Sequence, residues 1–157
     1  HNETTQLILE DMCEHIESTD KCMLDFGSGT AILAIAGVKL GIEKAIAIDI
    51  DDDSIENAID YAEINNVSDK ILIYKADLRE IDENDFDVIC ANITSNVIIP
   101  NMDLIHTKLK PGGKLFITGI LLEERETMAE KLTARGLKPV SVNQKAEWVS
   151  FYSKKTK

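Results

Sequence analysis

Apolar positions along the chain fall into two kinds of stretch that alternate for most of its length. One is a short unbroken apolar run, typical of a buried strand, and the other repeats its apolar residues every three or four positions, typical of an amphipathic helix. The runs that predict strands span residues 22–26, 45–48, 71–74, 86–91 and 114–119. The stretches that predict helices span residues 5–16, 32–40, 53–64, 98–109 and 123–134, with a Lys-Pro-Gly-Gly turn at 110–113.

The last part of the chain departs from this alternation. Residues 138–143 and 147–152 both have strand character, and the short segment between them suits a hairpin. Strands that alternate with helices and end in a hairpin predict an α/β fold, a mostly parallel seven-stranded sheet with helices on both faces and a C-terminal antiparallel hairpin. Because the sequence has no internal repeat, low-complexity segment or linker, residues 1–157 are predicted to form a single domain.

The charge balance narrows the choice of partner. The 157 residues include 17 lysines and arginines and 28 aspartates and glutamates, a formal net charge of −11. Proteins that bind along phosphates need a basic face, and the only basic run is at residues 154–157, so a nucleic-acid partner is disfavoured. The acidity suits solubility, and it also suits attraction of a basic, lysine-bearing partner. The sequence has no membrane-length apolar stretch and no signal peptide, which favours the cytoplasm.

Neither the cysteines nor the densest acidic run predicts a metal site. The three cysteines are far apart in the sequence, without the paired spacing of zinc ligands or of a disulfide framework. The acidic run Asp51-Asp52-Asp53 is better explained as a helix start, because Asp53 and Glu56 have the spacing of a capping box. Nothing in the sequence predicts the oligomeric state.

A glycine-rich turn, Asp25-Phe26-Gly27-Ser28-Gly29, follows the first predicted strand. A dinucleotide-binding fingerprint would have a third glycine where the chain has Ile32, and no P-loop triplet is present. A second acid, Asp49, ends the second strand. Since the carboxyl ends of parallel strands meet at one edge of a sheet, the glycines and Asp49 are expected to border one ligand crevice. The alternative is an ordinary strand-to-helix turn with a capping acid.

This pattern of acid, two glycines and a second acid resembles the first two motifs of the class I S-adenosylmethionine (AdoMet) methyltransferases. Further motifs resemble more closely the PrmA family, the methyltransferases of ribosomal protein L11. The resemblance covers almost the whole chain in order, through Thr4-Thr5, the glycine turn, Ile32-Leu33-Ala34-Ile35-Ala36, Lys39-Leu40-Gly41, Asp49-Ile50-Asp51, Ala91-Asn92-Ile93, Leu109-Lys110-Pro111-Gly112-Gly113, Thr118-Gly119-Ile120 and Glu147-Trp148.

The resemblance implies a Rossmann-like class I methyltransferase fold, AdoMet as methyl donor, and methylation of lysine side-chain and N-terminal amines of a ribosomal protein. It also implies that the family's N-terminal substrate-recognition domain is absent from this chain. At matching positions, the implied AdoMet contacts are Thr5, Gly27, Asp49 and Asn92, with Gly29 and Asp77 as additional ones. The chain departs from the family pattern at Ala31, Val97 and residues 94–96. Val97 and residues 94–96 are expected to face the acceptor.

Two of these residues keep a second interpretation. Asp77 follows the third strand and either binds the adenine amino group or caps a turn. Asn92 follows the fourth strand and is expected to orient the acceptor amine as the catalytic residue, although it could be a simple turn residue. Methylation of a small-molecule or nucleobase amine, and AdoMet binding without catalysis, stay open as alternative functions.

Overall fold

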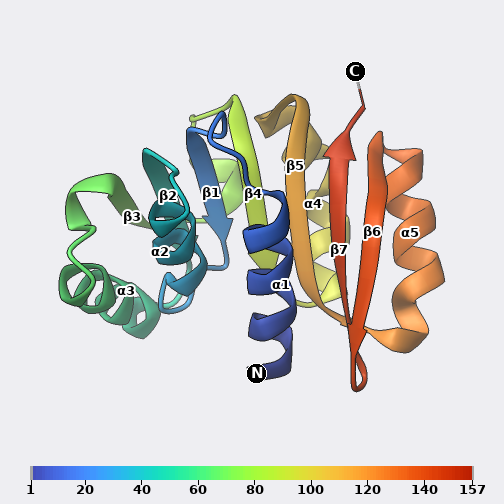
Figure 1. Ribbon diagram of the computed structural model, residues 1–157, viewed down its shortest axis with the longest axis horizontal. Helices are drawn as coiled ribbons and strands as arrows, with labels where there is room; N and C mark the ends of the chain where they lie inside the picture. Colours follow the sequence, from blue (N-terminus) through green and yellow to red (C-terminus); the bar gives the residue numbers. More distant parts are fainter. Residues whose placement is uncertain (1, 157) are drawn as a thin grey trace.

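The computed structural model describes residues 2–156 as one mixed sheet flanked by helices (Figure 1). The strands are β1 Cys22–Phe26, β2 Lys44–Asp49, β3 Ile71–Lys75, β4 Phe86–Asn92, β5 Leu109–Leu121, β6 Leu137–Lys145 and β7 Trp148–Lys155. The helices are α1 Asn2–His15, α2 Ile32–Lys39, α3 Asp52–Ile64, α4 Ser95–Lys108 and α5 Arg125–Ala134. Short 3₁₀ turns are η1 Ser68–Lys70, η2 Leu78–Glu80 and η3 Leu122–Glu124.

The strands are ordered β3-β2-β1-β4-β5-β7-β6 across the sheet. Strands β1 to β5 are parallel to one another, while β7 lies antiparallel between β5 and β6. The predicted mostly parallel sheet with a terminal antiparallel hairpin is therefore confirmed. The chain builds outward from β1 to β3 and then returns to place β4 on the other side of β1. Such a switch in strand order opens a crevice at the carboxyl ends of the strands.

Two hydrophobic clusters lie on opposite faces of the sheet, because successive side chains of a strand alternate in direction. The face covered by α1, α2 and α3 is called the α1 face here, and Figure 1 shows α1 and α2 on it with α4 behind the sheet. The α1 face buries residues of these helices against alternate strand positions such as Met23, Val88, Cys90 and Phe116. The opposite face buries α4 and α5 against Leu24, Ile89 and Leu115.

Three local predictions from the sequence are wrong. Helix α1 begins at Asn2, three residues before the predicted start, so Thr5 lies inside the helix and not at its N-terminus. The side chain of Asp51, rather than Asp53, caps α3 by accepting from the Ser54 backbone N–H at 3.1 Å. Leu109 begins β5, and the predicted turn at 110–113 is an irregularity inside that strand: pairing moves from Phe86–Leu109 to Val88–Lys114.

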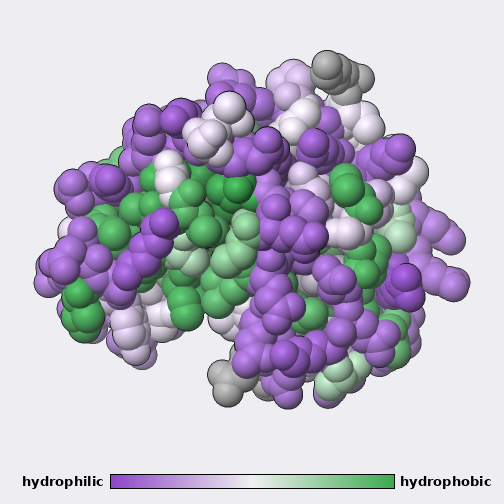
Figure 2. Space-filling model, viewed as in Figure 1, coloured by the Kyte–Doolittle hydropathy of each residue, from purple (hydrophilic) through white to green (hydrophobic). Residues whose placement is uncertain are grey.

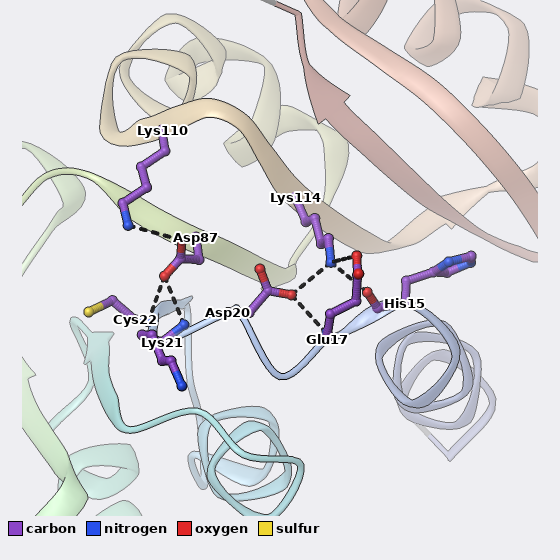
Figure 3. Close-up of polar contacts among 8 residues, drawn as sticks. All are labelled: His15, Glu17, Asp20, Lys21, Cys22, Asp87, Lys110 and Lys114. Carbon is purple, nitrogen blue, oxygen red and sulfur yellow. Dashed lines mark hydrogen bonds and ion pairs between the residues drawn. The ribbon is translucent and has the colours of Figure 1, made fainter.

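A buried lysine ties α1 to the sheet at the edge where β1 begins (Figure 3). The Lys114 ammonium donates to the His15 carbonyl and to carboxylate oxygens of Glu17 and Asp20, each at 2.7 Å. Burial alone would lower the pKa of Lys114, but its hydrogen bonds to the two carboxylates and their charges raise it. Lys114 therefore stays charged and is fully partnered, which a buried cation requires.

Asp87 makes a second polar link at this edge. Its Oδ2 accepts from the backbone N–H groups of Lys21 at 2.8 Å and Cys22 at 3.0 Å, and its Oδ1 pairs with Lys110. Burial would raise the pKa of Asp87, but these hydrogen bonds and the lysine charge outweigh it and lower the pKa. The start of β1 is thereby attached to β4. No helix within residues 2–156 is both long and apolar enough to cross a bilayer.

Candidate cofactor site

A cavity of about 220 Å³ opens at the carboxyl ends of the central strands. Its walls come from the ends of β1, β2 and β3 and from the segment after β4. The lining residues are Phe26, Gly27, Ile48, Asp49, Ile50, Ala76, Asp77, Ile93 and Val97. The structure thus brings three predicted site residues, Gly27, Asp49 and Asp77, to one cavity at the predicted edge of the sheet.

The glycine turn after β1 is fastened to the neighbouring strand. The backbone N–H groups of Gly27 and Ser28 both donate to the Ile48 carbonyl, at 3.0 and 2.9 Å. Gly27 has φ +74°, a conformation that favours glycine, and a Cβ there would lie 2.5 Å from Cγ2 of Ile93. A side chain at this position would therefore push against the cavity wall.

Asp49 holds the two sides of the crevice together. Its Oδ2 accepts from the Gly29 backbone N–H at 2.8 Å, and its Oδ1 accepts from the Asp51 N–H at 3.0 Å. These bonds fix the carboxylate between the glycine turn and the start of α3. A carboxylate oxygen can accept more than one hydrogen bond, so both oxygens keep capacity for a ligand's hydroxyl groups.

Asp25 is a buried carboxyl group directly beneath the glycine turn. Its Oδ2 accepts from the Ala34 backbone N–H in α2 at 3.1 Å, while its Oδ1 is buried and has no partner among the described residues. Burial raises the pKa of Asp25 to about 7, and the nearby charge of Asp49 adds to the increase, against the lowering effect of the bond from Ala34. The sequence placed Asp25 in the motif but gave no sign of this pKa.

The entry into α2 uses an alanine in a conformation that favours glycine. Ala31 is the N-cap residue of α2 with φ 61° and ψ 24°, in the left-handed region. Ala31, one of the departures from the family pattern, therefore has a backbone conformation that glycine adopts more readily. A non-glycine residue in this region is strained unless its surroundings hold it there.

Asp77 both lines the cavity and caps the following turn. Its Oδ1 accepts from the Leu78 N–H at 2.8 Å, its Oδ2 pairs with the Arg79 guanidinium at 3.1 Å, and its own N–H donates to Glu80 at 2.8 Å. The capping interpretation is confirmed, and the carboxylate is already partly used. A ligand role for Asp77 stays a prediction.

Asn92 and Thr5 lie at the same sheet edge but not in the cavity wall described above. Asn92 ends β4, and its Oδ1 lies 3.5 Å from the position that a Cβ of Gly119 would take. Thr5 is half-buried near the start of α1, and Figure 1 places that end of α1 at the side of the sheet toward which β1 and β4 run. Within residues 2–156, the cavity lining does not include Thr5, Gly29 or Asn92. Val97 was expected to face the acceptor and lies in the cavity wall, whereas Ile93 was noted only as part of a motif and its place in that wall was not predicted.

A larger hollow, of about 350 Å³, lies between α2 and α3. It is lined by Thr30, Ile32, Ile35, Tyr61 and Asn65, and Figure 2 shows a concentration of hydrophobic residues on this side of the molecule. No ionisable side chain except the Tyr61 phenol lines this hollow among the described residues. It lacks the carboxylate that the crevice at β1 and β2 offers to a cationic, hydroxylated ligand.

The strand order, the glycine turn after β1 and the acid after β2 together define the Rossmann-like fold of the class I methyltransferases. A ribosomal protein L11 methylase from Lactobacillus delbrueckii subsp. bulgaricus has the same fold, with a TM-score of 0.92 at 24% identity over 100% of this chain and 80% of that chain. An RNA methyltransferase from Salinibacter ruber, solved with S-adenosyl-L-homocysteine, gives a TM-score of 0.76 at 19% identity over 96% of this chain and 91% of that chain.

The family is shown by the sequence match. Residues 1–156 match the model of the ribosomal protein L11 methyltransferase (PrmA) family, and the chain belongs to that family. The ribosomal protein L11 methyltransferase of Agathobacter rectalis is 31% identical over 164 residues, covering 98% of this chain and 51% of the relative. The chain spans about half the length of the curated relatives that it matches. The fold and family predicted from the sequence motifs are therefore confirmed.

Proposed function

We propose that this chain is the AdoMet-binding and methyl-transfer unit of a protein N-methyltransferase that acts on amines of ribosomal protein L11. The observation that carries the proposal is the position of the Asp49 carboxylate. It is fixed by the Gly29 N–H at the mouth of the crevice, where the strand order switches and the glycine turn leaves the backbone accessible. Family membership and the solved relatives support the same function.

The residues at this edge fit the separate parts of the cofactor. Asp49 would accept both ribose hydroxyls through the capacity that its two oxygens retain. Gly27 and Gly29 would let the backbone approach the methionine part, and Asp77 would border the adenine. Thr5 and Asn92 would complete the site from α1 and β4. The 220 Å³ cavity suits one part of such a ligand, with the remainder lying along the open edge.

AdoMet, when bound, supplies a methyl group on a positively charged sulfur, and the leaving group is a neutral thioether. The protein therefore needs no acid catalyst, and its main contribution is to hold donor and acceptor in line. A lysine acceptor has an ordinary pKa near 10.4 and must lose a proton before it attacks. Asn92 is suited to orient the neutral amine through its side-chain oxygen without acting as a base.

The charge of the chain supports a basic acceptor. A net charge of −11 attracts a lysine-rich ribosomal protein and disfavours a nucleic-acid substrate. We place this reaction in the bacterial cytoplasm, where ribosomal proteins are made. In this proposal residues 1–157 form one cofactor-binding domain, and a separate domain, as the family resemblance implies, recognises the ribosomal protein.

The test is methyl transfer from AdoMet to purified ribosomal protein L11, followed by mass spectrometry of the intact protein and of its peptides. The proposal expects mass increases of whole methyl groups on lysine or N-terminal amines. Small-molecule amines and nucleobases serve as the comparison acceptors. Transfer to one of these but not to L11 would refute the proposed acceptor, and AdoMet binding without any transfer would refute the enzyme assignment.

A further inference from the structure

Thr118 carries a buried hydroxyl group with no hydrogen-bond partner among the described residues. The residue is 0% exposed, near the carboxyl end of β5. A buried hydroxyl without a partner destabilises the fold, and native proteins rarely keep one without a reason. The described part of the chain holds few such atoms, and Thr118 is the one that lies beside Asn92.

The sheet register places Thr118 next to Asn92. The two residues are paired in the parallel ladder between β4 and β5. Paired residues of parallel strands have side chains on the same face. Cys90 and Phe116, two positions earlier in each strand, both belong to the cluster on the α1 face, so Asn92 and Thr118 share that face. Helix α1 packs on β5 and covers this part of the sheet.

A β-bulge lies at the same point of β5. Pairing with β7 is regular up to Ile117 and resumes at Ile120, so Thr118 and Gly119 interrupt the ladder. Gly119 has φ +90°, and a Cβ there would lie 2.9 Å from the Ile93 carbonyl oxygen. Bulges next to active sites reorient side chains. The bulge and the glycine therefore let the backbone of β5 approach the end of β4 closely, next to the paired residues Asn92 and Thr118.

We propose that Thr118 is a positioning residue for Asn92, an inference that rests on the proposed function. The Thr118 hydroxyl accepts a hydrogen bond from the Asn92 side-chain nitrogen when donor and acceptor occupy the site. That bond decides which end of the carboxamide faces the acceptor amine, so that the oxygen is presented to it. In the free protein the hydroxyl lacks its partner, and the cost of burying it is offset only in the occupied site.

The test compares two substitutions at Thr118 with a control elsewhere. Thr118→Val has nearly the same shape and removes the hydroxyl, whereas Thr118→Ser keeps it. Ser153→Ala is the matched control, because the Ser153 hydroxyl is equally buried and unpartnered but lies toward the other end of β5, paired with Leu115. The measurements are the melting temperature, the AdoMet dissociation constant, and kcat for methyl transfer to ribosomal protein L11.

Thr118→Val should raise the melting temperature by about 2 to 4 °C, since it removes an unpaired polar group. It should nevertheless lower kcat by about 10- to 100-fold through misplacement of Asn92, with AdoMet affinity changed less than about twofold. Thr118→Ser should retain most of the activity, and Ser153→Ala should leave kcat unchanged. In an Asn92→Ala background, Thr118→Val should have no further effect on kcat, because the two residues act as one unit.

Two results would overturn the proposal: a Thr118→Val enzyme with parental kcat, or additive losses in the double variant. If valine prevents folding, Thr118→Ala serves in its place with the same expectations for kcat. Failure of the proposed function itself is distinguishable, because it would appear in the parent protein as a lack of methyl transfer. Failure of the proposed role of Thr118 would appear instead as an active parent protein whose Thr118 variants do not show the expected changes in kcat.

Discussion

Asp25 makes the stability of this protein depend on pH in a direction that is unusual for a carboxylate. Its pKa rises from an ordinary 3.8 to about 7 on folding, mainly through burial. Between these values the folded state binds more protons than the unfolded state, so stability falls as the pH rises. The stabilising contribution of Asp25 is fully present below about pH 4 and is lost progressively between about pH 4 and pH 7. Above about pH 7 it does not change further.

The size of the effect follows from the same values. A tenfold change in proton affinity corresponds to about 1.4 kcal/mol. The difference between pKa values of 3.8 and about 7 therefore corresponds to a loss of at most about 4 kcal/mol in the free energy of unfolding, complete by pH 8. Asp25→Asn removes the titration and keeps an oxygen that can accept from Ala34. The added amide nitrogen destabilises the variant by an amount that does not depend on pH. The quantity to measure is therefore how the difference in free energy of unfolding between the variant and the parent changes with pH.

The assay is urea unfolding of the parent and Asp25→Asn from pH 4 to pH 8.5. Stability of the variant relative to the parent should rise by about 2 to 4 kcal/mol across this range, with most of the change between pH 5 and 7.5. Asp60→Asn, which removes a charge from the exposed surface of α3, controls for the net charge. A difference between Asp25→Asn and the parent that stays constant with pH would refute the buried, protonated state of Asp25.

Three other substitutions test separate parts of the structure. Gly27→Ala should destabilise the fold by about 1–3 kcal/mol and weaken AdoMet binding, because the added Cβ would lie 2.5 Å from Cγ2 of Ile93. Urea unfolding measures the stability and calorimetry the binding, and parental values of both would refute the close approach. Asp20→Ala should lower the free energy of unfolding by about 3 kcal/mol, because it removes a carboxylate partner of the buried Lys114 ammonium. Urea unfolding at pH 7 measures the change, and a loss below about 0.5 kcal/mol would contradict the role of the pair. Asn92→Ala should keep AdoMet binding measurable by calorimetry while methyl transfer collapses; unchanged turnover would refute its catalytic role.

The sequence predicted those parts of the fold that local patterns determine. Each strand of the central sheet is an apolar run, and the terminal hairpin follows from two such runs with a short gap. Errors arose where two patterns overlap. Leu109 continues the apolar spacing of α4 and also begins β5, and only its pairing with Phe86 decides between them. The four residues after it were predicted to form a turn, but they belong to the strand and form an irregularity in its pairing with β4.

The candidate site was predictable in its chain positions and not in its contacts. Gly27, Asp49 and Asp77 follow strands that the sequence identified, so their meeting at one cavity could be expected. The bond from Gly29 to Asp49 depends on the conformation of the turn, which spacing does not reveal. Thr118 was noted only as part of a motif, because its importance comes from a bulge and from the register with β4.

Calorimetric titration of AdoMet into the parent protein and into Asp49→Ala tests the central claim most directly. Loss of hydrogen bonds from two ribose hydroxyls to a charged acceptor should cost about 3 kcal/mol or more, which is an affinity loss of at least about 100-fold. Asp60→Ala, on the exposed surface of α3, should bind as the parent does. If Asp49→Ala binds AdoMet as tightly as the parent, the cofactor does not rest on this carboxylate and the account is wrong.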